Sequence, residues 1–238
     1  MRRQKLNVRV MLLRVQIKNM KATLIGATGL IGNYLLEELL KDPFFDTVRI
    51  LIRRPMDKAD PKLEKKIVDF NDSDSLLVAV KNSDVVFCAI GTTQKKVKGD
   101  KDAYYKIDFG IPVNLSRLCK MTGCEKFVLV SSVGANSKSN NFYLKLKGET
   151  DEAVKASGIK TIHIMRPSVL LGERNESRLG EKFGKAVLTA ISFLTPSKYK
   201  PIQGKDVAKA MLAVSKKNEE GYFVHENAEI KRISSGDL

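Results

Sequence analysis

Ser132, Tyr143 and Lys147 are side chains that together could reduce a carbonyl group. Tyr143 and Lys147 are four residues apart in a segment of helical periodicity, so both should lie on one face of a helix. A tyrosine hydroxyl can give its proton to a growing alkoxide, but an ordinary pKa of about 10 is poorly matched to neutral pH. A nearby ammonium, such as that of Lys147, favours the phenolate and lowers that pKa. Ser132 ends a run that is typical of a strand, and it would hold the carbonyl oxygen.

A glycine-rich segment with the spacing G-x-x-G-x-x-G could bind a cofactor for this chemistry. It follows a short apolar run, residues 22–25, and precedes helical periodicity over residues 30–40. Gly26 permits a tight turn, Gly29 lets the backbone approach a pyrophosphate, and Gly32 lets the helix pack closely on the strand. Free N–H groups of the first helical turn would bind the phosphates. The pattern predicts a dinucleotide site, and the alternative is a glycine-rich turn without a ligand.

The residues after a second predicted strand, 47–52, indicate which dinucleotide binds. NAD sites usually carry an acid about 20 residues after the glycines, whereas this chain has Arg53 and Arg54 there. Arginine can bind a 2′-phosphate through paired charge-assisted hydrogen bonds, so NADP(H) is favoured over NAD(H). The alternative is a solvated arginine pair that closes a strand. After a polar loop over residues 56–66, Asp69 could bind the adenine amino group or form a local Asx turn.

A buried run over residues 84–90 continues into a turn of small residues. Ligands of an open α/β sheet lie beyond the carboxyl ends of the strands, so this turn should lie beside the glycines. The residues expected there are Ala89, Ile90, Gly91 and Thr92. With a dinucleotide bound, Lys147 would also bind the nicotinamide ribose.

Predicted strands and helices alternate along the chain. Asp69 ends a third strand over residues 67–70. Further strands are expected over residues 126–132 and 161–165, and helices over residues 76–80, 103–122 and 143–156. Pro112 should mark a kink or an early turn of its helix. We therefore expect an α/β fold: a Rossmann-like, doubly wound parallel sheet with helices on both faces.

Residues 21–238 are expected to form one NAD(P)-binding domain, whose C-terminal part, about residues 170–238, makes a small lid on the substrate side. A helix over residues 205–212 and a short strand over 223–225 are the clearest elements of that part. One charged cluster is either a structural ion network or part of the substrate mouth: Arg174, Glu176 and Arg178.

Residues 1–20 form a basic extension without any acid; its cations are Arg2, Arg3, Lys5, Arg9, Arg14 and Lys18. Met20 stands directly before the first strand, so the preceding residues are an extension or a misassigned start. Two alternatives are a surface helix and a targeting segment, because Arg-rich, acid-free composition loosely resembles a mitochondrial presequence. The apolar part is interrupted and no small-residue cleavage site follows, which makes a poor secretory signal.

The net charge of +15 invites a nucleic-acid partner. The sequence contains no recognition-helix motif, zinc spacing or aromatic-basic platform, so no such partner is expected. No apolar run reaches about 18 residues, so no membrane span is expected. Three cysteines without metal spacing indicate a reducing compartment, and we expect a cytoplasmic location. His163 and His225 have no matching partner in the sequence and are expected to be structural.

Five further stretches accompany the glycine spacing and the Y-x-x-x-K pair: 91–93, 131–135, 143–149, 166–171 and 174–178. With them the chain resembles the short-chain dehydrogenase/reductases, in their extended and atypical branches. Within these it is most similar to the Tat-interacting-protein group of oxidoreductases. The resemblance covers residues 20–230, nearly the whole chain.

The resemblance implies roles for individual residues. Ser132, Tyr143 and Lys147 take the catalytic positions, and Pro167 and Val169 present backbone to the nicotinamide carboxamide. The cofactor would be lined by Gly26, Thr28, Gly29, Leu30, Ile31, Arg53, Asp69, Ala89 and Gly91.

Two departures from the family pattern bear on function. Many relatives have an asparagine in the helix after the fourth strand, where it supports a proton relay, and this chain has Asp108. The part after Pro167 is short, so a sugar-nucleotide epimerase is not expected.

The first hypothesis is an NADP(H)-dependent oxidoreductase acting on a carbonyl or quinone-like small molecule. The alternative is an NADP(H)-binding, redox-sensing regulator with little or no turnover, which would act on a protein partner.

Overall fold

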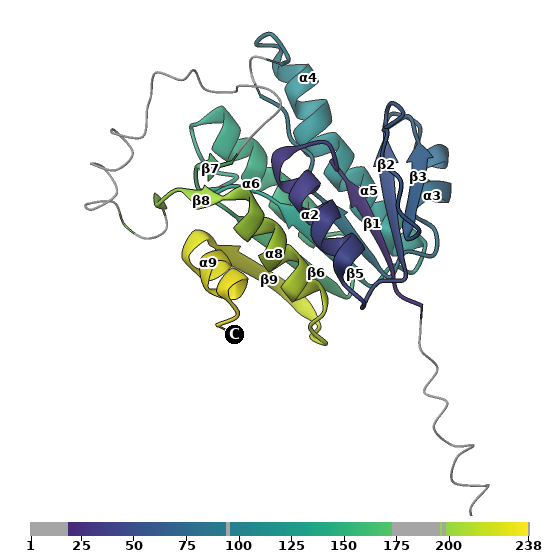
Figure 1. The fold of residues 1–238 in the computed structure, drawn as a ribbon. Coiled ribbons are helices and arrows are strands. Elements are labelled where there is room, and N and C mark those ends of the chain that lie inside the picture. The colour runs from purple at the N-terminus through teal and green to yellow at the C-terminus, as the bar shows by residue number, and fades with distance from the viewer. Residues whose placement is uncertain (1–18, 94–95, 173–195, 197–198, 238) are drawn as a thin grey trace, which may run out of the picture.

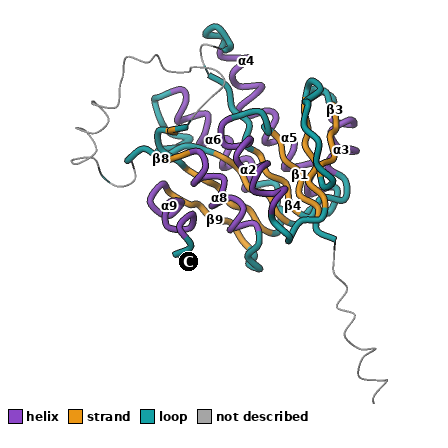
Figure 2. The backbone as a smooth tube through the Cα atoms, in the orientation of Figure 1, coloured by secondary structure: helices purple, strands orange, loops and turns teal. Residues whose placement is uncertain are grey.

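The computed structural model describes residues 19–93, 96–172, 196 and 199–237. Within them, seven parallel strands form one sheet in the order β3-β2-β1-β4-β5-β6-β9. The strands are β1 (Lys21–Ile25), β2 (Thr47–Ile52), β3 (Leu63–Ile67), β4 (Val85–Cys88), β5 (Lys126–Val130), β6 (Thr161–Arg166) and β9 (Gly221–Glu226). Figure 2 shows these strands as an inner layer between helices.

Helices cover both faces of the sheet, as Figure 1 shows. One face carries α2 (Leu30–Lys41), α8 (Gly204–Ser215) and α9 (Asn227–Ser235), and the other carries α3 (Ser73–Val80), α5 (Ile111–Met121) and α6 (Phe142–Lys155). Each layer has its own buried apolar cluster against the sheet. Successive side chains of each strand point to opposite faces of the sheet, so one strand contributes residues to both clusters. The expected doubly wound α/β fold is confirmed.

The strand order reverses between β1 and β4. Leu24 of β1 pairs with Ile50 of β2 on one side and with Phe87 of β4 on the other. The chain leaves β1 toward β2 and β3, and then crosses back to β4 and the strands beyond. This topological switch point is where open α/β sheets bind ligands, at the carboxyl ends of the strands.

The third strand lies earlier in the chain than predicted. It spans Leu63–Ile67, so the loop expected over residues 56–66 and the strand expected over 67–70 were both wrong in extent. The strand is at the sheet edge and is only partly buried, and its lysines hide the apolar pattern of a strand. Charged side chains are common on edge strands because they discourage pairing with other chains. Asp69 consequently lies in the turn after β3.

The long helix predicted over residues 103–122 is interrupted. It consists of α4 (Lys101–Tyr105), a π-helical turn η1 (Lys106–Gly110) and α5, which has Pro112 in its first turn. Proline has no N–H, so Pro112 cannot donate to the carbonyl of Asp108 four residues earlier. That carbonyl accepts a hydrogen bond from the Thr150 hydroxyl of α6 instead, at 3.2 Å. Pro112 is thus the cause of the early-turn break that the sequence indicated.

The C-terminal part adds a small second sheet and a last helix. β7 (Leu170–Leu171) pairs with β8 (Ile202–Gln203), and α8 then packs against α2. The sequence predicted α8 and the strand within β9, but it did not predict α9. Arg174, Glu176 and Arg178 lie outside the described residues, as do residues 1–18 of the basic extension. Among the described helices, none combines the length and apolar character that a membrane span requires.

Candidate active site

The turn between β1 and α2 is held by contacts that only glycine allows. The Gly29 N–H donates to the Gly26 carbonyl at 2.9 Å, which closes the turn. Gly26 has φ of 90°, and a Cβ there would lie 2.6 Å from the Ala89 carbonyl oxygen. A Cβ on Gly32 would lie 2.0 Å from the Gly26 carbonyl oxygen. These two glycines let α2 and the end of β4 pack directly against the turn.

The N-terminus of α2 fits a phosphate group. Gly29 is its N-cap residue and provides no side-chain hydrogen bond to the first turn. Thr28 and Gly29 are exposed, Leu30 is half-buried, and Ile31 is buried in the core. Ile31 can therefore contribute only its backbone, whereas Thr28 can contribute its side chain. Bare N–H groups and the positive end of the helix dipole attract a pyrophosphate.

The segment after β4 lies beside this turn, as the sequence predicted. The Ala89 N–H donates to the Ile25 carbonyl of β1 at 2.9 Å. Ala89 and Ile90 are half-buried and Gly91 is exposed. The Thr92 N–H donates to Oδ2 of Asp108 at 2.8 Å, which ties this segment to η1.

The residues expected to select the dinucleotide lie at the ends of β2 and β3. Arg53 and Arg54 are both exposed, and neither makes an ion pair with any residue that the structure describes. Oδ1 of Asp69 accepts hydrogen bonds from the Asn71 backbone and side-chain N–H groups, at 2.9 and 3.0 Å. The Asx turn is thus formed, and it leaves Oδ2 as the atom that could face an adenine.

Ser132 lies at the start of the turn that connects β5 to α6, and Tyr143 lies in the first turn of α6. The Asn136 N–H donates to the Leu144 carbonyl at 3.0 Å, so the turn lies against the first turn of the helix. Ser132 is half-buried, whereas Ser131 is 5% exposed. Ser132 is therefore the serine of this pair that a small molecule could reach.

Tyr143 and Lys147 lie on one face of α6, packed on each other. The Lys147 ammonium is 6.0 Å from the centre of the Tyr143 ring. The edge of that ring meets Tyr104 of α4 at a centroid distance of 6.4 Å. A buried ammonium beside an aromatic ring is stabilised by a cation–π interaction.

Lys147 also forms a buried ion pair that the sequence analysis did not predict. Its Nζ lies 3.0 Å from Oδ1 of Asp108, and the two residues are 5% and 1% exposed. Burial disfavours the ammonium, but the Asp108 carboxylate outweighs it and holds the pKa of Lys147 above its usual range. The only sequence signal was the acid itself, at the position where many relatives have an amide.

Pro167 and Val169 follow the carboxyl end of β6, the end of the strands at which the glycine turn also lies. The Pro167 carbonyl accepts a hydrogen bond from the Val133 N–H at 2.9 Å, and the Val169 carbonyl accepts one from the Ile202 N–H at 3.0 Å. Pro167 is buried, whereas Val169 is 54% exposed. Because proline has no N–H, any backbone donor from this pair is that of Val169.

A second group of charges, centred on the buried Asp151 and missed from the sequence, lies next to this site. Asp151 follows Lys147 by one helical turn of α6 and is 2% exposed. Its Oδ2 accepts from Arg166 of β6 at 2.9 Å, and Arg166 also reaches Glu226 of β9 at 3.3 Å. The i, i+4 spacing of Tyr143, Lys147 and Asp151 could have indicated this polar stripe on the inner face of α6.

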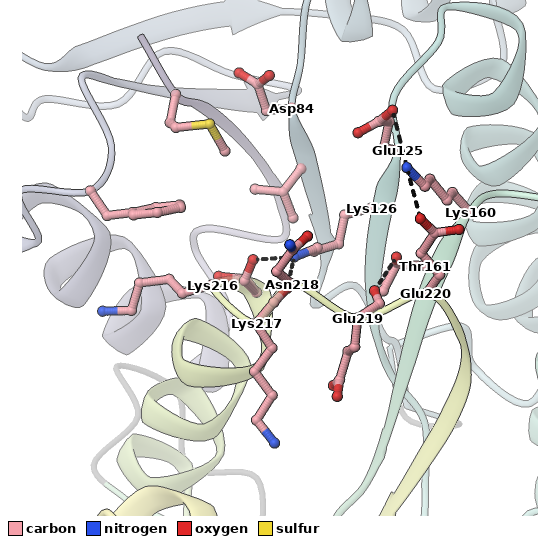
Figure 3. Close-up of a pocket in the computed structure, with 14 residues that line it drawn as sticks. Asp84, Glu125, Lys126, Lys160, Thr161, Lys216, Lys217, Asn218, Glu219 and Glu220 are labelled. Atoms are coloured by element: carbon pink, nitrogen blue, oxygen red, sulfur yellow. Dashed lines mark hydrogen bonds and ion pairs between the residues drawn. The ribbon is translucent and has the colours of Figure 1, made fainter. Parts of the chain in front are cut away.

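A cavity of about 320 Å³ lies at the opposite, amino-terminal edge of the sheet (Figure 3). Lys126, at the start of β5, points into it and donates to the carbonyls of Ser215 and Lys217, at 2.7 and 2.6 Å. Burial lowers the pKa of this lysine. The bonds fix the connection between α8 and β9, which is a structural role. The catalytic candidates and the glycine turn lie at the other edge.

The chain matches a family model described as NAD(P)H-binding over residues 26–218. It is 33% identical over 211 residues to "Protein FMP52, mitochondrial" of Candida albicans. The aligned residues cover 85% of this chain and 90% of that protein. It is 34% identical over 169 residues to Protein HTATIP2 of Rattus norvegicus, which covers 70% and 69%.

Solved structures share the fold at low sequence identity. MoeE5 in complex with UDP-glucuronic acid and NAD has a TM-score of 0.69 at 17% identity, over 87% of this chain and 76% of that chain. Uronate dehydrogenase from Agrobacterium tumefaciens has a TM-score of 0.65 at 17% identity, over 86% and 75%. These likenesses establish the Rossmann-like architecture.

The expected cytoplasmic location is wrong by these comparisons. Relatives from Candida albicans, Debaryomyces hansenii and Saccharomyces cerevisiae are all named as mitochondrial proteins. The cysteine argument failed because reduced thiols indicate a reducing environment and do not distinguish among the compartments that provide one. By its match over residues 26–218 and its identity to FMP52 and HTATIP2, the chain belongs to the NAD(P)H-binding, atypical short-chain dehydrogenase/reductase family.

Proposed function

We propose that this protein is an NADP(H)-dependent oxidoreductase that transfers a hydride to or from a carbonyl or quinone-like small molecule. The observation that carries the proposal is the packing of Tyr143 on a buried, charged Lys147 at the carboxyl edge of the sheet. The uncapped N-terminus of α2 lies at the same edge. A proton donor and a phosphate-binding helix at one switch point are the two parts that such a reaction requires.

The cofactor would lie along the carboxyl ends of the strands, and it supplies or accepts the hydride when bound. The first turn of α2 would bind its pyrophosphate, with Gly26, Thr28 and Gly29 around it. Lys147 keeps two N–H donors beyond the one that Asp108 accepts, and these suit the ribose hydroxyls. The residues proposed to line the rest of the site are Leu30, Ile31, Gly32, Asp69, Ala89, Ile90, Gly91, Thr92, Pro167 and Val169.

The reacting oxygen would be held by two hydroxyl groups. Ser132 donates a hydrogen bond to the carbonyl oxygen, and Tyr143 gives it a proton as negative charge develops there. The ammonium of Lys147 stabilises the phenolate that remains. In the reverse direction Tyr143 removes the proton of the alcohol.

Arg53 and Arg54 support NADP(H) over NAD(H). Both guanidinium groups are exposed beyond β2, and within the described residues no carboxylate pairs with them. They are thus available for a 2′-phosphate, which arginine binds through two parallel hydrogen bonds.

The reaction is tested by the loss of NADPH absorbance with a panel of dicarbonyls and quinones. The wild-type protein is compared with Tyr143→Phe and with Tyr34→Phe, a half-buried tyrosine that packs against the core from α2. Turnover that persists in Tyr143→Phe would contradict the catalytic assignment. Tight NADPH binding without turnover of any compound would favour the alternative, a cofactor-sensing regulator.

We also propose a mitochondrial location, because relatives in several yeasts carry that word in their names. The acid-free basic segment over residues 1–20 is consistent with a targeting role. A fluorescent fusion at the C-terminus tests this, compared with the same fusion that starts at Met20. Cytosolic fluorescence of both fusions would contradict the location, and mitochondrial fluorescence of both would remove the targeting role from residues 1–19.

A further inference from the structure

Asp108 is a buried carboxylate between two parts of the proposed site. Its Oδ1 lies 3.0 Å from Nζ of Lys147 on α6, and its Oδ2 accepts from the Thr92 N–H after β4 at 2.8 Å. The side chain is 1% exposed. Each carboxylate oxygen therefore joins η1 to a different element, and both of those elements line the proposed cofactor site.

The π-helical turn η1 fixes this arrangement from the backbone. Because Pro112 cannot donate to the Asp108 carbonyl, that carbonyl accepts from the Thr150 hydroxyl of α6 at 3.2 Å. Thr150 follows Lys147 by three residues on the same helix. The backbone and the side chain of Asp108 thus both bind α6, and wide turns of this kind are frequent at functional sites.

Several titratable groups surround the ammonium of Lys147. The titratable groups that act on the ammonium come from η1, α4, β4 and α6 itself: Asp108, Tyr104, Cys88, Tyr143 and Asp151.

Cys88 carries no negative charge near neutral pH, and the Asp151 carboxylate is paired with another cation. Burial raises the pKa of Cys88 to about 12, so it is a neutral thiol. Asp151 is bound by Arg166 at 2.9 Å, and burial raises its pKa. Among the described residues, Asp108 is the carboxylate in direct ion-pair contact with Lys147.

We propose that Asp108 is a positioning residue that keeps Lys147 charged and holds its ammonium at the carboxyl edge, where the cofactor ribose would bind. This inference rests on the proposed function for the identity of the ligand. An asparagine has nearly the same shape and its side-chain oxygen can accept from the Thr92 N–H. It supplies no negative charge, however, so a buried Lys147 beside it would lose its proton more readily.

The test is the protonation of Lys147 in the cofactor-free protein. Lysine labelled with ¹³C at Cε gives a chemical shift that reports the charge of Nζ, and Lys147→Arg identifies the signal. We expect the wild-type signal to show no deprotonation up to about pH 11, above the ordinary lysine value of about 10.4. Asp108→Asn should lower the midpoint by at least one pH unit, about a tenfold change in the proton equilibrium.

The matched control is Asp102→Asn, the same chemical change at an exposed position of α4. It should leave the Lys147 signal unchanged. A wild-type midpoint at or below the ordinary value would overturn the proposal, even if Asp108→Asn fails to fold. Equal midpoints in the wild type and in a folded Asp108→Asn would also overturn it.

A second readout is the dissociation constant of NADPH from about pH 7 to about pH 10. In Asp108→Asn the affinity should fall at least about twofold more than in the wild type over this range, because a midpoint of about pH 10 removes half of the ammonium at the upper end. An equal pH dependence in both proteins would contradict the cofactor part of the inference. If the wild type binds no NADPH, the proposed function fails, while the lysine signal still decides the role of Asp108.

Discussion

At the scale of single residues, the central feature is the group formed by Tyr143, Lys147 and Asp108. The sequence predicted that Tyr143 and Lys147 share a helical face, and they do, but the carboxylate that pairs with Lys147 comes from a separate turn. A pairing between residues 39 positions apart leaves no local pattern, because it depends on how η1 packs against α6. Asp108 could therefore be noticed as an unusual residue, but its partner could not be named.

Replacement of Tyr143 by phenylalanine should separate chemistry from binding. The ring keeps its packing against Tyr104 and Lys147, but the proton donor is lost. We expect turnover to fall by about 100-fold to 10,000-fold, with the NADPH dissociation constant changed by less than about threefold. Steady-state kinetics and a binding titration measure the two effects. A parallel loss of affinity would indicate that Tyr143 serves cofactor binding instead of proton transfer.

His163 should make the protein less stable in acid. Burial, with nearby cations, lowers the pKa of His163 to about 3, below the ordinary value of 6.5 in the unfolded chain. The unfolded state therefore binds the proton first, and stability is lost as the pH falls below about 6.5. The expected loss is about 2 kcal/mol between about pH 7 and about pH 5.

Urea unfolding at each pH measures this loss. The control is His163→Gln, which keeps a polar side chain beside His225 but does not titrate. Its free energy of unfolding should change less over the same pH range. An equal acid sensitivity of the variant and the wild type would assign the effect to other groups.

At the scale of helices and strands, the sequence predicted those elements whose bounds follow from a clear local pattern of apolar residues. β2 was predicted with both of its ends correct, because its apolar run is buried on both faces. β3 was misplaced because its lysines lie at the sheet edge, and the helix break at η1 was only indicated by Pro112. The last helix, α9, was missed because only its Ile230 and Ile233 are buried apolar residues, too few for a clear period.

The close contact between the glycine turn after β1 and the first turn of α2 gives a testable prediction. An alanine at position 32 would place its Cβ 2.0 Å from the Gly26 carbonyl, so the turn and the helix must move apart. Gly32→Ala should lower the free energy of unfolding by about 1–3 kcal/mol and weaken NADPH binding. Gly110→Ala is the matched control, because Gly110 has φ of −57° and its Cβ would meet its nearest neighbour only at 4.0 Å.

The control variant should be neutral or up to about 1 kcal/mol more stable, since alanine restricts the unfolded chain. Thermal or urea unfolding and an NADPH titration compare the two variants. Unchanged binding by Gly32→Ala would contradict the close packing at the glycine turn.

At the scale of the whole molecule, the carboxyl and amino ends of the strands carry different groups of residues. The carboxyl edge carries the glycine turn, the arginines after β2 and the polar stripe of α6. The amino edge carries a cavity whose central lysine is bound to backbone carbonyls. The fold class followed from the alternation of strands and helices, and the same alternation is the reason for proposing a site at the carboxyl ends of the strands. The cellular location did not follow, because it is not encoded in the packing of the domain.

The most direct measurement is a calorimetric titration of the wild-type protein with NADPH and NADH side by side. We expect NADPH to bind at least about tenfold more tightly, through charge-assisted bonds to Arg53 and Arg54. Replacement of both arginines by alanine should remove that preference, while Arg117→Ala, an exposed change on α5, should keep it. Tighter binding of NADH would contradict the choice of cofactor, and binding of neither would contradict the proposed function.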